Sequence, residues 1–137
     1  MNRAVWAVIA IITIVFVIFE AVKYGWVAAA VITVFAIAPD VPLIAAFGER
    51  GRLRPAHVRP YNLTHSVWLP LALMVASIVL PIPELGLGLR GGFELFLAGL
   101  AWFAHIAADR ALGYGLRAAD GSIRPVGRGA VPTWCTS

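Results

Sequence analysis

Four long apolar stretches constrain the fold of this chain more than any other feature. They cover about residues 4–22, 26–47, 63–80 and 93–112. A helix of about 20 residues crosses the hydrocarbon core of a bilayer, because each residue adds about 1.5 Å to a span of about 30 Å. The pattern therefore predicts an all-α protein, a four-helix transmembrane bundle, with the lipid bilayer as its surroundings.

The composition excludes an ordinary soluble domain. The 137 residues are 61% hydrophobic and 13% charged, whereas soluble domains carry about 25% charged residues. The net charge is +4, but the sequence lacks the interleaved basic and aromatic residues of a nucleic-acid-binding module, so nucleic acid is not an expected partner. The single cysteine, Cys135, allows no intrachain disulfide.

Positive charges predict how the helices are oriented. Arg3 precedes the first stretch, four arginines lie in the loop of residues 48–61, and further arginines follow the last stretch. Cytoplasmic loops are enriched in Lys and Arg, so both termini and this loop are expected in the cytoplasm. We therefore expect a multi-pass protein of the bacterial inner (cytoplasmic) membrane. No small-residue cleavage site follows the first stretch, which is therefore expected to remain as an uncleaved span.

The chain is expected to consist of a folded domain and an irregular tail. Residues 1–117 are predicted to form the transmembrane domain. Residues 118–137 are rich in Gly, Pro and Arg and show no periodicity. They are predicted to form an irregular cytoplasmic tail.

Four potential metal ligands are predicted to meet at the cytoplasmic ends of three helices. Asp40 lies between two prolines, where the second stretch should kink or end, and His65 lies in the first turn of the third predicted helix. His105 and Asp109 are four residues apart and share one face of the fourth helix. Ionisable side chains are costly inside a membrane, so these four residues are expected to have a common use or partner.

This set of side chains has the chemistry of a transition-metal site. Two imidazoles and two carboxylates suit Zn, Fe or Mn, and the set contains too much nitrogen for an all-oxygen Mg or Ca site. Asn62, Ser66 and Tyr114 are candidates for groups that orient the ligands. A metal held here could activate a water molecule, as in a metal-dependent hydrolase.

The same residues allow other interpretations. A closed cluster of ion pairs would pin three helices together without a metal. His65 and His105 could instead both ligate a haem or a pigment magnesium as a cofactor. As a separate alternative, the chain could be a non-enzymatic accessory subunit of a larger membrane complex, with membrane-protein partners or further copies of itself (a homo-oligomer) against its apolar faces. A transporter is least favoured, since only Glu20 and Glu94, expected to be interfacial, lie toward the opposite end.

Three motifs carry a resemblance to known families. They are Ala38-Pro39-Asp40, Tyr61-Asn62-Leu63-x-His65 and His105-Ile106-x-x-Asp109-Arg110-Ala111-Leu112-Gly113-Tyr114-Gly115-Leu116. Over about residues 26–117 the chain resembles the small bacterial membrane proteins of domain-of-unknown-function family 4260, which implies four helices and no assigned activity. More distantly, the segments around Asp40, His65 and His105 resemble landmarks of the membrane-bound metal-dependent hydrolases, although Pro42 stands where that family usually has a second Asp.

Overall fold

The computed structural model describes residues 1–48, 52–84 and 90–127. Its elements are α1 (Arg3–Tyr24), α2 (Trp26–Ile37), the 3-10 helix η1 (Ala38–Leu43), α3 (Pro55–Thr64), α4 (Trp68–Val79) and α5 (Gly92–Leu112). They provide four spans that are long and apolar enough to cross a membrane, the third formed by α3 and α4 together. The prediction of an all-α transmembrane bundle is confirmed. Arg50, Arg128 and Cys135 lie outside the described residues.

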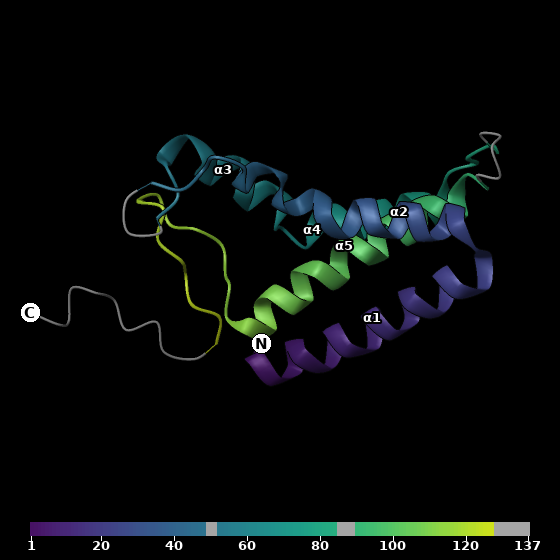
Figure 1. Cartoon of the computed structure of the whole chain (residues 1–137), viewed down its shortest axis with the longest axis horizontal. Coiled ribbons are helices and arrows are strands. Elements are labelled where there is room, and N and C mark those ends of the chain that lie inside the picture. Colours follow the sequence, from purple (N-terminus) through teal and green to yellow (C-terminus); the bar gives the residue numbers. More distant parts are fainter. Residues whose placement is uncertain (49–51, 85–89, 128–137) are drawn as a thin grey trace, which may run out of the picture.

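Helix α5 lies at the centre of the bundle and packs against α1, α2 and α4 (Figure 1). Its buried face is made largely of small residues, such as Ala98, Gly99 and Ala101. These residues let the helices approach closely, because a Cβ atom on Gly99 would lie only 2.9 Å from the carbonyl oxygen of Pro70. Close packing of this kind holds helices together where the surrounding lipid is as apolar as the helices themselves.

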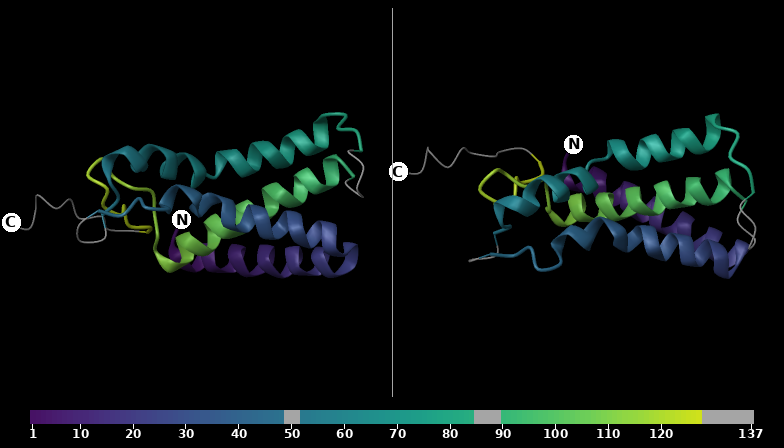
Figure 2. Two further views of the ribbon diagram at one scale, coloured as in Figure 1. Left: turned by 45° about the horizontal axis from the view of Figure 1, so that its top comes forward. Right: turned by 90° about the horizontal axis from the view of Figure 1, so that it is seen from above.

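The ends of α1 and α5 meet at one end of the bundle. Arg3 donates hydrogen bonds of 2.9 Å from Nε to the carbonyl of Ala111 and from Nη2 to that of Leu112. At the other end, the rings of Tyr24 and Phe93 lie 4.5 Å apart. The long helices run alongside one another between these ends (Figure 2). We call the end with Arg3, η1 and α3 the site end; the side of the membrane that it faces stays a prediction.

The third span breaks at a place that the sequence did not predict. A polar loop was expected up to residue 61, followed by one helix over residues 63–80 with His65 in its first turn. Instead α3 begins at Pro55, His65 follows its last residue, and α4 begins at Trp68. Pro70 favours the break, because a proline ring clashes with the carbonyl four residues earlier and fits best in the first turn of a helix, although Pro60 is accommodated inside α3. His65 therefore lies in the turn between two helices.

The second span ends as predicted, near its prolines. The α-helix continues to Ile37 and changes to the 3-10 turns of η1, which contain Asp40. The apolar residues beyond η1 leave the span. Ala46 packs with Leu53 and Tyr61 in a small core beside α3.

The segment after α5 folds back onto the site end. Arg117 and Ile123 pair in an antiparallel bridge, and the turn between them contacts the loop that follows η1. Leu53 donates its backbone N–H to the carbonyl of Gly121 at 3.1 Å. Gly121 has a φ of 79°, a left-handed conformation that glycine adopts readily. The tail predicted from residue 118 onward thus begins with a defined turn, and the domain boundary at residue 117 stays a prediction.

Candidate metal centre

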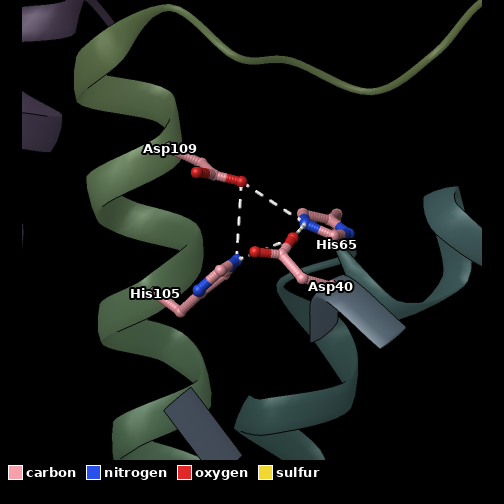
Figure 3. A group of neighbouring side chains, drawn as sticks. All are labelled: Asp40, His65, His105 and Asp109. Carbon is pink, nitrogen blue, oxygen red and sulfur yellow. Dashed lines mark ion pairs between the residues drawn. The ribbon is translucent and has the colours of Figure 1, made fainter. Parts of the chain in front are cut away.

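Four side-chain atoms from three parts of the chain converge at the site end (Figure 3). They are Oδ1 of Asp40 in η1, Nε2 of His65 after α3, and Nε2 of His105 and Oδ2 of Asp109 in α5. The distances to Asp40 and Asp109 are both 3.3 Å from His65, and 3.5 and 3.6 Å from His105. The ligand atoms all lie within 4.8 Å of one another. The structure therefore brings together the four residues that were predicted as metal ligands.

The four distances between imidazole and carboxylate atoms, 3.3–3.6 Å, are those of ion pairs and also suit ligands of a shared ion. Ligand atoms at about 2.1 Å from an ion are about 3.4 Å apart along the edges of a tetrahedron. Direct hydrogen bonds between imidazolium and carboxylate are shorter, about 2.7–2.9 Å. The Nε2 atoms of His65 and His105 are buried and have no hydrogen-bond partner among the described residues. A buried polar atom without a partner is costly, so an ion at the centre would satisfy both imidazoles.

His65 is oriented so that its Nε2 atom faces this cluster. Its Nδ1 atom lies 3.1 Å from the carbonyl oxygen of Tyr61 and 3.2 Å from the hydroxyl of Thr64. A carbonyl oxygen can only accept a hydrogen bond, so donation to it places the hydrogen on Nδ1 and the lone pair on Nε2. The Tyr61 ring also stacks on the imidazole, with 3.8 Å between the ring centroids. This is how proteins commonly fix a metal-binding histidine.

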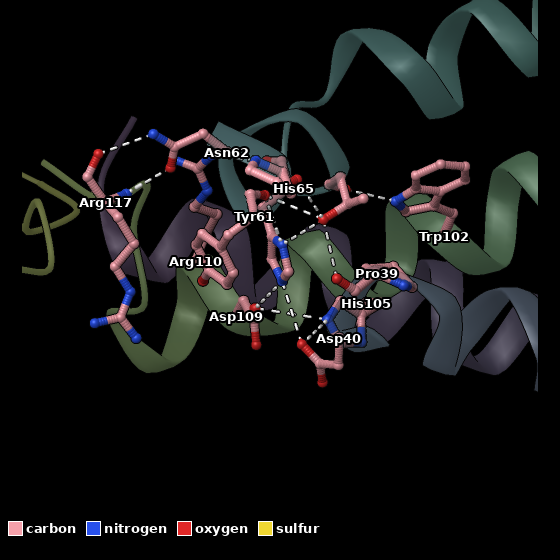
Figure 4. A network of polar contacts seen from close by, with 12 residues as sticks. Pro39, Asp40, Tyr61, Asn62, His65, Trp102, His105, Asp109, Arg110 and Arg117 are labelled. Carbon is pink, nitrogen blue, oxygen red and sulfur yellow. Dashed lines mark hydrogen bonds and ion pairs between the residues drawn. The ribbon is translucent and has the colours of Figure 1, made fainter. Parts of the chain in front are cut away.

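Hydrogen bonds to backbone carbonyls connect the elements that carry the cluster (Figure 4). The Thr64 hydroxyl lies 3.0 Å from the carbonyl oxygen of Pro39, which ties α3 to η1. The indole N–H of Trp102 donates to the carbonyl of Thr64 at 2.7 Å. Arg110 donates from Nη2 to the carbonyl of His65 at 3.2 Å. The last two bonds attach α5 to the turn that holds His65.

The residues predicted to orient the ligands have other contacts. Asn62 holds the backbone of Arg117 on both sides, since Oδ1 accepts from its N–H at 2.7 Å and Nδ2 donates to its carbonyl at 2.9 Å. The Ser66 hydroxyl accepts from the N–H of Trp68 at 3.4 Å. Tyr114 lies on the wall of an adjoining cavity. Asn62 therefore anchors the segment after α5.

The residues that do fix the cluster were not predicted, although one of them left a signal. Trp102 precedes His105 by three residues and Asp109 by seven, so all three share one face of α5. Tyr61 and Thr64 act partly through their backbone carbonyls, at the end of a helix that the sequence did not locate. Their roles therefore could not be inferred from side-chain chemistry.

A cavity of about 430 Å³ adjoins the cluster. The carboxylates of Asp40 and Asp109 lie on its wall, together with Arg117 and the apolar side chains of Leu43 and Phe47. The side chains of Asp40 and Asp109 are 46% and 21% exposed, whereas that of His65 is 3% exposed. The cluster is therefore buried at His65 and accessible from the cavity on its carboxylate side.

The fold and the cluster define a class, a multi-span membrane protein with an Asp/His cluster at one end of its helices. Within that class, the chain belongs to the family described as domain of unknown function (DUF4260), whose model matches residues 5–124. The match includes α1 and the turn after α5, and it confirms the resemblance found over residues 26–117. Searches of curated proteins and of solved structures gave no match. The likeness to membrane-bound metal-dependent hydrolases stays a prediction.

Proposed function

We propose that this protein binds a divalent transition metal through Asp40, His65, His105 and Asp109, and that the cluster is a hydrolase-like site. The observation that carries the proposal is the convergence of four ligand atoms within 4.8 Å of one another, two of them buried imidazole nitrogens without a hydrogen-bond partner among the described residues. Two carboxylates so close together also repel each other unless a cation lies between them. Zn, Fe or Mn suits the mixed nitrogen and oxygen ligands.

The cavity gives this site the access that a reaction needs. A bound ion would supply Lewis-acid chemistry toward a water molecule or a substrate oxygen in the cavity. Asp40 is the proposed general base, because its side chain is half-exposed on the cavity wall. Its Oδ1 atom faces both imidazoles, which leaves its Oδ2 atom available to accept a proton. His65 and His105 hold the ion, and Tyr61 keeps His65 in its orientation.

The distribution of charge supports a cytoplasmic location for the site end. Arg3, Arg52 and Arg54 lie there outside the helices or at their ends, and Arg59 lies within α3. Positive residues at these positions favour the cytoplasmic side of a bacterial inner membrane. A substrate would then reach the cavity from the cytoplasm or from the inner leaflet.

A haem or pigment between the two histidines suits the geometry less well. The ring centroids of His65 and His105 are 5.5 Å apart, and the rings meet at 65°. Both Nε2 atoms face the same two carboxylate oxygens. A porphyrin plane between the histidines would have to displace Asp40 and Asp109.

An accessory subunit with a structural metal is the second candidate function. Its support is the complete set of four protein ligands, because structural zinc sites are closed in this way and catalytic sites keep an open position. The large apolar side chains on the outer helices, such as Phe19 and Ile78, would suit lipid or a partner membrane protein equally.

Metal content tests the proposed site. Protein purified in detergent without added metal is expected to contain about one Zn, Fe or Mn ion per chain, measured by elemental analysis. His105→Gln and Asp109→Asn should lose the ion. Glu20→Gln is the matched control, since Glu20 is a buried acid in α1, toward the opposite end, and it should retain the ion.

Two results would contradict or redirect this proposal. Absence of a stoichiometric metal, together with no binding of added Zn²⁺, Mn²⁺ or Fe²⁺, contradicts the metal site. A metal-loaded protein that hydrolyses no ester, but whose unfolding temperature depends on the metal, favours the accessory subunit.

A further inference from the structure

Arg117 is a buried positive charge without a carboxylate partner among the described residues. The residue is 7% exposed, and its Nε atom has no hydrogen-bond partner within the described ranges. Its Nη1 atom makes one long hydrogen bond, 3.3 Å to the carbonyl oxygen of Gly121. No carboxylate of residues 1–48, 52–84 and 90–127 forms an ion pair with it. A buried charge is costly unless an anion or a set of acceptors satisfies it.

The burial of Arg117 distinguishes it from arginines that only set topology. Arg52 lies in the loop between η1 and α3, and its side chain is 59% exposed. Its Nη1 atom lies 3.7 Å from Oδ2 of Asp120 at the surface. Arg117 instead has its backbone held on both sides by Asn62. Its guanidinium lies over the ring of Tyr61, 5.3 Å from the centroid. The structure thus fixes this charge beside the residue that orients His65.

Arg117 and the carboxylates of the cluster face one cavity. Asp40, Asp109 and Arg117 all contribute to its wall, and their charged groups extend toward the same side of the network (Figure 4). The volume of about 430 Å³ is within the range of about 300–1,000 Å³ for small-molecule sites. A ligand in the cavity would therefore meet the Asp/His cluster and a guanidinium that lacks a carboxylate partner together.

We propose that Arg117 binds the oxygen atoms of a phosphoryl group in this cavity, which makes a phosphate ester the substrate class of the site. The inference rests on the proposed function and gives it a substrate. A guanidinium presents a planar fork of donors that matches phosphate oxygens. A phosphoryl group has enough oxygens to contact Arg117 and the cluster at once. The apolar walls at Leu43, Phe47 and Ile123 would contact the organic part of the ester.

The phosphoryl group can come from a soluble ester or from a lipid headgroup, and two probes distinguish them. Inorganic phosphate is titrated into the full-length, zinc-loaded protein in detergent, with binding followed by calorimetry. Separately, the protein in nanodiscs of phosphatidylcholine is compared with the protein in nanodiscs that contain phosphatidic acid, with the unfolding temperature as the readout.

Variants of Arg117 test the assignment. Arg117→Gln should weaken binding of the effective probe at least tenfold while the metal content stays at one ion per chain. Arg117→Lys keeps the charge and loses the fork, so it should bind with intermediate affinity. If Arg117→Gln folds poorly, Arg117→Lys alone still tests the role of the guanidinium in binding the probe. Arg124→Gln is the matched control, because Arg124 lies on the same turn and is exposed, and its probe affinity should equal that of the wild type.

The outcomes separate this inference from the proposed metal site. Arg117-dependent binding of inorganic phosphate supports a soluble ester, and Arg117-dependent stabilisation by phosphatidic acid alone supports a lipid headgroup. Equal binding by the wild type and both Arg117 variants overturns the inference, as does a metal-loaded protein that responds to neither probe. If the chain holds no metal but binds phosphate through Arg117, the metal site fails and the phosphoryl site stands.

Discussion

The Nε2 atom of His65 lies 3.3 Å from the Oδ2 atom of Asp109, across the contact between α5 and the turn that follows α3. This distance is longer than a charge-assisted hydrogen bond. The Oδ1 atom of Asp40 lies at the same distance from the same nitrogen. One imidazole therefore lies at ion-pair distance from two carboxylates without a hydrogen bond to either, a relation that three ligands around a common ion would also show.

Removal of the metal should destabilise the site end. Without a cation, the carboxylates of Asp40 and Asp109 repel each other and the two buried imidazoles lack a partner. A ligand present at 1,000 times its dissociation constant stabilises the folded state by about 4 kcal/mol. The unfolding temperature in detergent should therefore fall by several degrees after chelation and recover after one equivalent of zinc. An unfolding temperature that ignores both treatments would argue against a bound metal.

Thr64→Val should weaken metal binding without removing a ligand. The substitution keeps the shape of the side chain but deletes the hydroxyl that lies near the Pro39 carbonyl and Nδ1 of His65. Loss of such a supporting contact typically lowers metal affinity 10- to 100-fold. Thr33→Val is the matched control, since the Thr33 hydroxyl bonds within its own helix, to the carbonyl of Ala29. Competition with a chelating dye measures the metal affinity of each variant. Thr64→Val should bind the metal more weakly than the wild type, and Thr33→Val should bind it equally well.

Trp102→Phe should loosen the attachment of α5 to the turn at His65. The indole hydrogen bond to the carbonyl of Thr64 is 2.7 Å long and partly buried, and its loss should cost about 1 kcal/mol of unfolding free energy. Trp26→Phe is the control, because Trp26 is exposed on the outside of the bundle. Equal unfolding free energies for the two variants, measured by denaturant titration in mixed micelles, would show that the bond has no stabilising role.

Gly99→Ala should destabilise the packing of α5 against α4. The new Cβ atom would lie 2.7 Å from Cγ of Met74 and 2.9 Å from the carbonyl oxygen of Pro70. Such overpacking typically costs about 1–3 kcal/mol. Gly48→Ala is the comparison, since its Cβ would meet neighbours at ordinary distances of 3.5 and 3.6 Å. The unfolding temperature should fall for Gly99→Ala and stay unchanged for Gly48→Ala. A fall for Gly48→Ala alone would mean that α4 and α5 are not in close contact at Gly99.

The sequence predicted the bundle and the convergence of Asp40, His65, His105 and Asp109 because both depend on simple patterns. Apolar length identifies the spans, and the spacing of His105 and Asp109 on one turn places them together. Topology then brings Asp40 and His65 to the same end. These inferences needed no knowledge of the helix ends.

The break at His65 and the supporting contacts could not be inferred in the same way. The effect of Pro70 depends on whether a helix starts just before it or runs through it, and both occur in membrane proteins. The contacts of Tyr61, Thr64 and Asn62 join distant parts of the chain to backbone groups, which carry no sequence signal. The burial of Arg117 likewise depends on how the segment after α5 folds back, and its charge alone resembles that of a topological arginine.

X-ray absorption at the edge of the co-purified metal tests the central claim most directly. The geometry of Asp40, His65, His105 and Asp109 predicts two nitrogen and two oxygen ligands at about 2.0–2.2 Å, with the multiple-scattering pattern of two imidazoles. His65→Ala should reduce that pattern to one imidazole. A shell of oxygen atoms alone, or a spectrum that His65→Ala and His105→Ala leave unchanged, would contradict the assignment of the metal to this cluster.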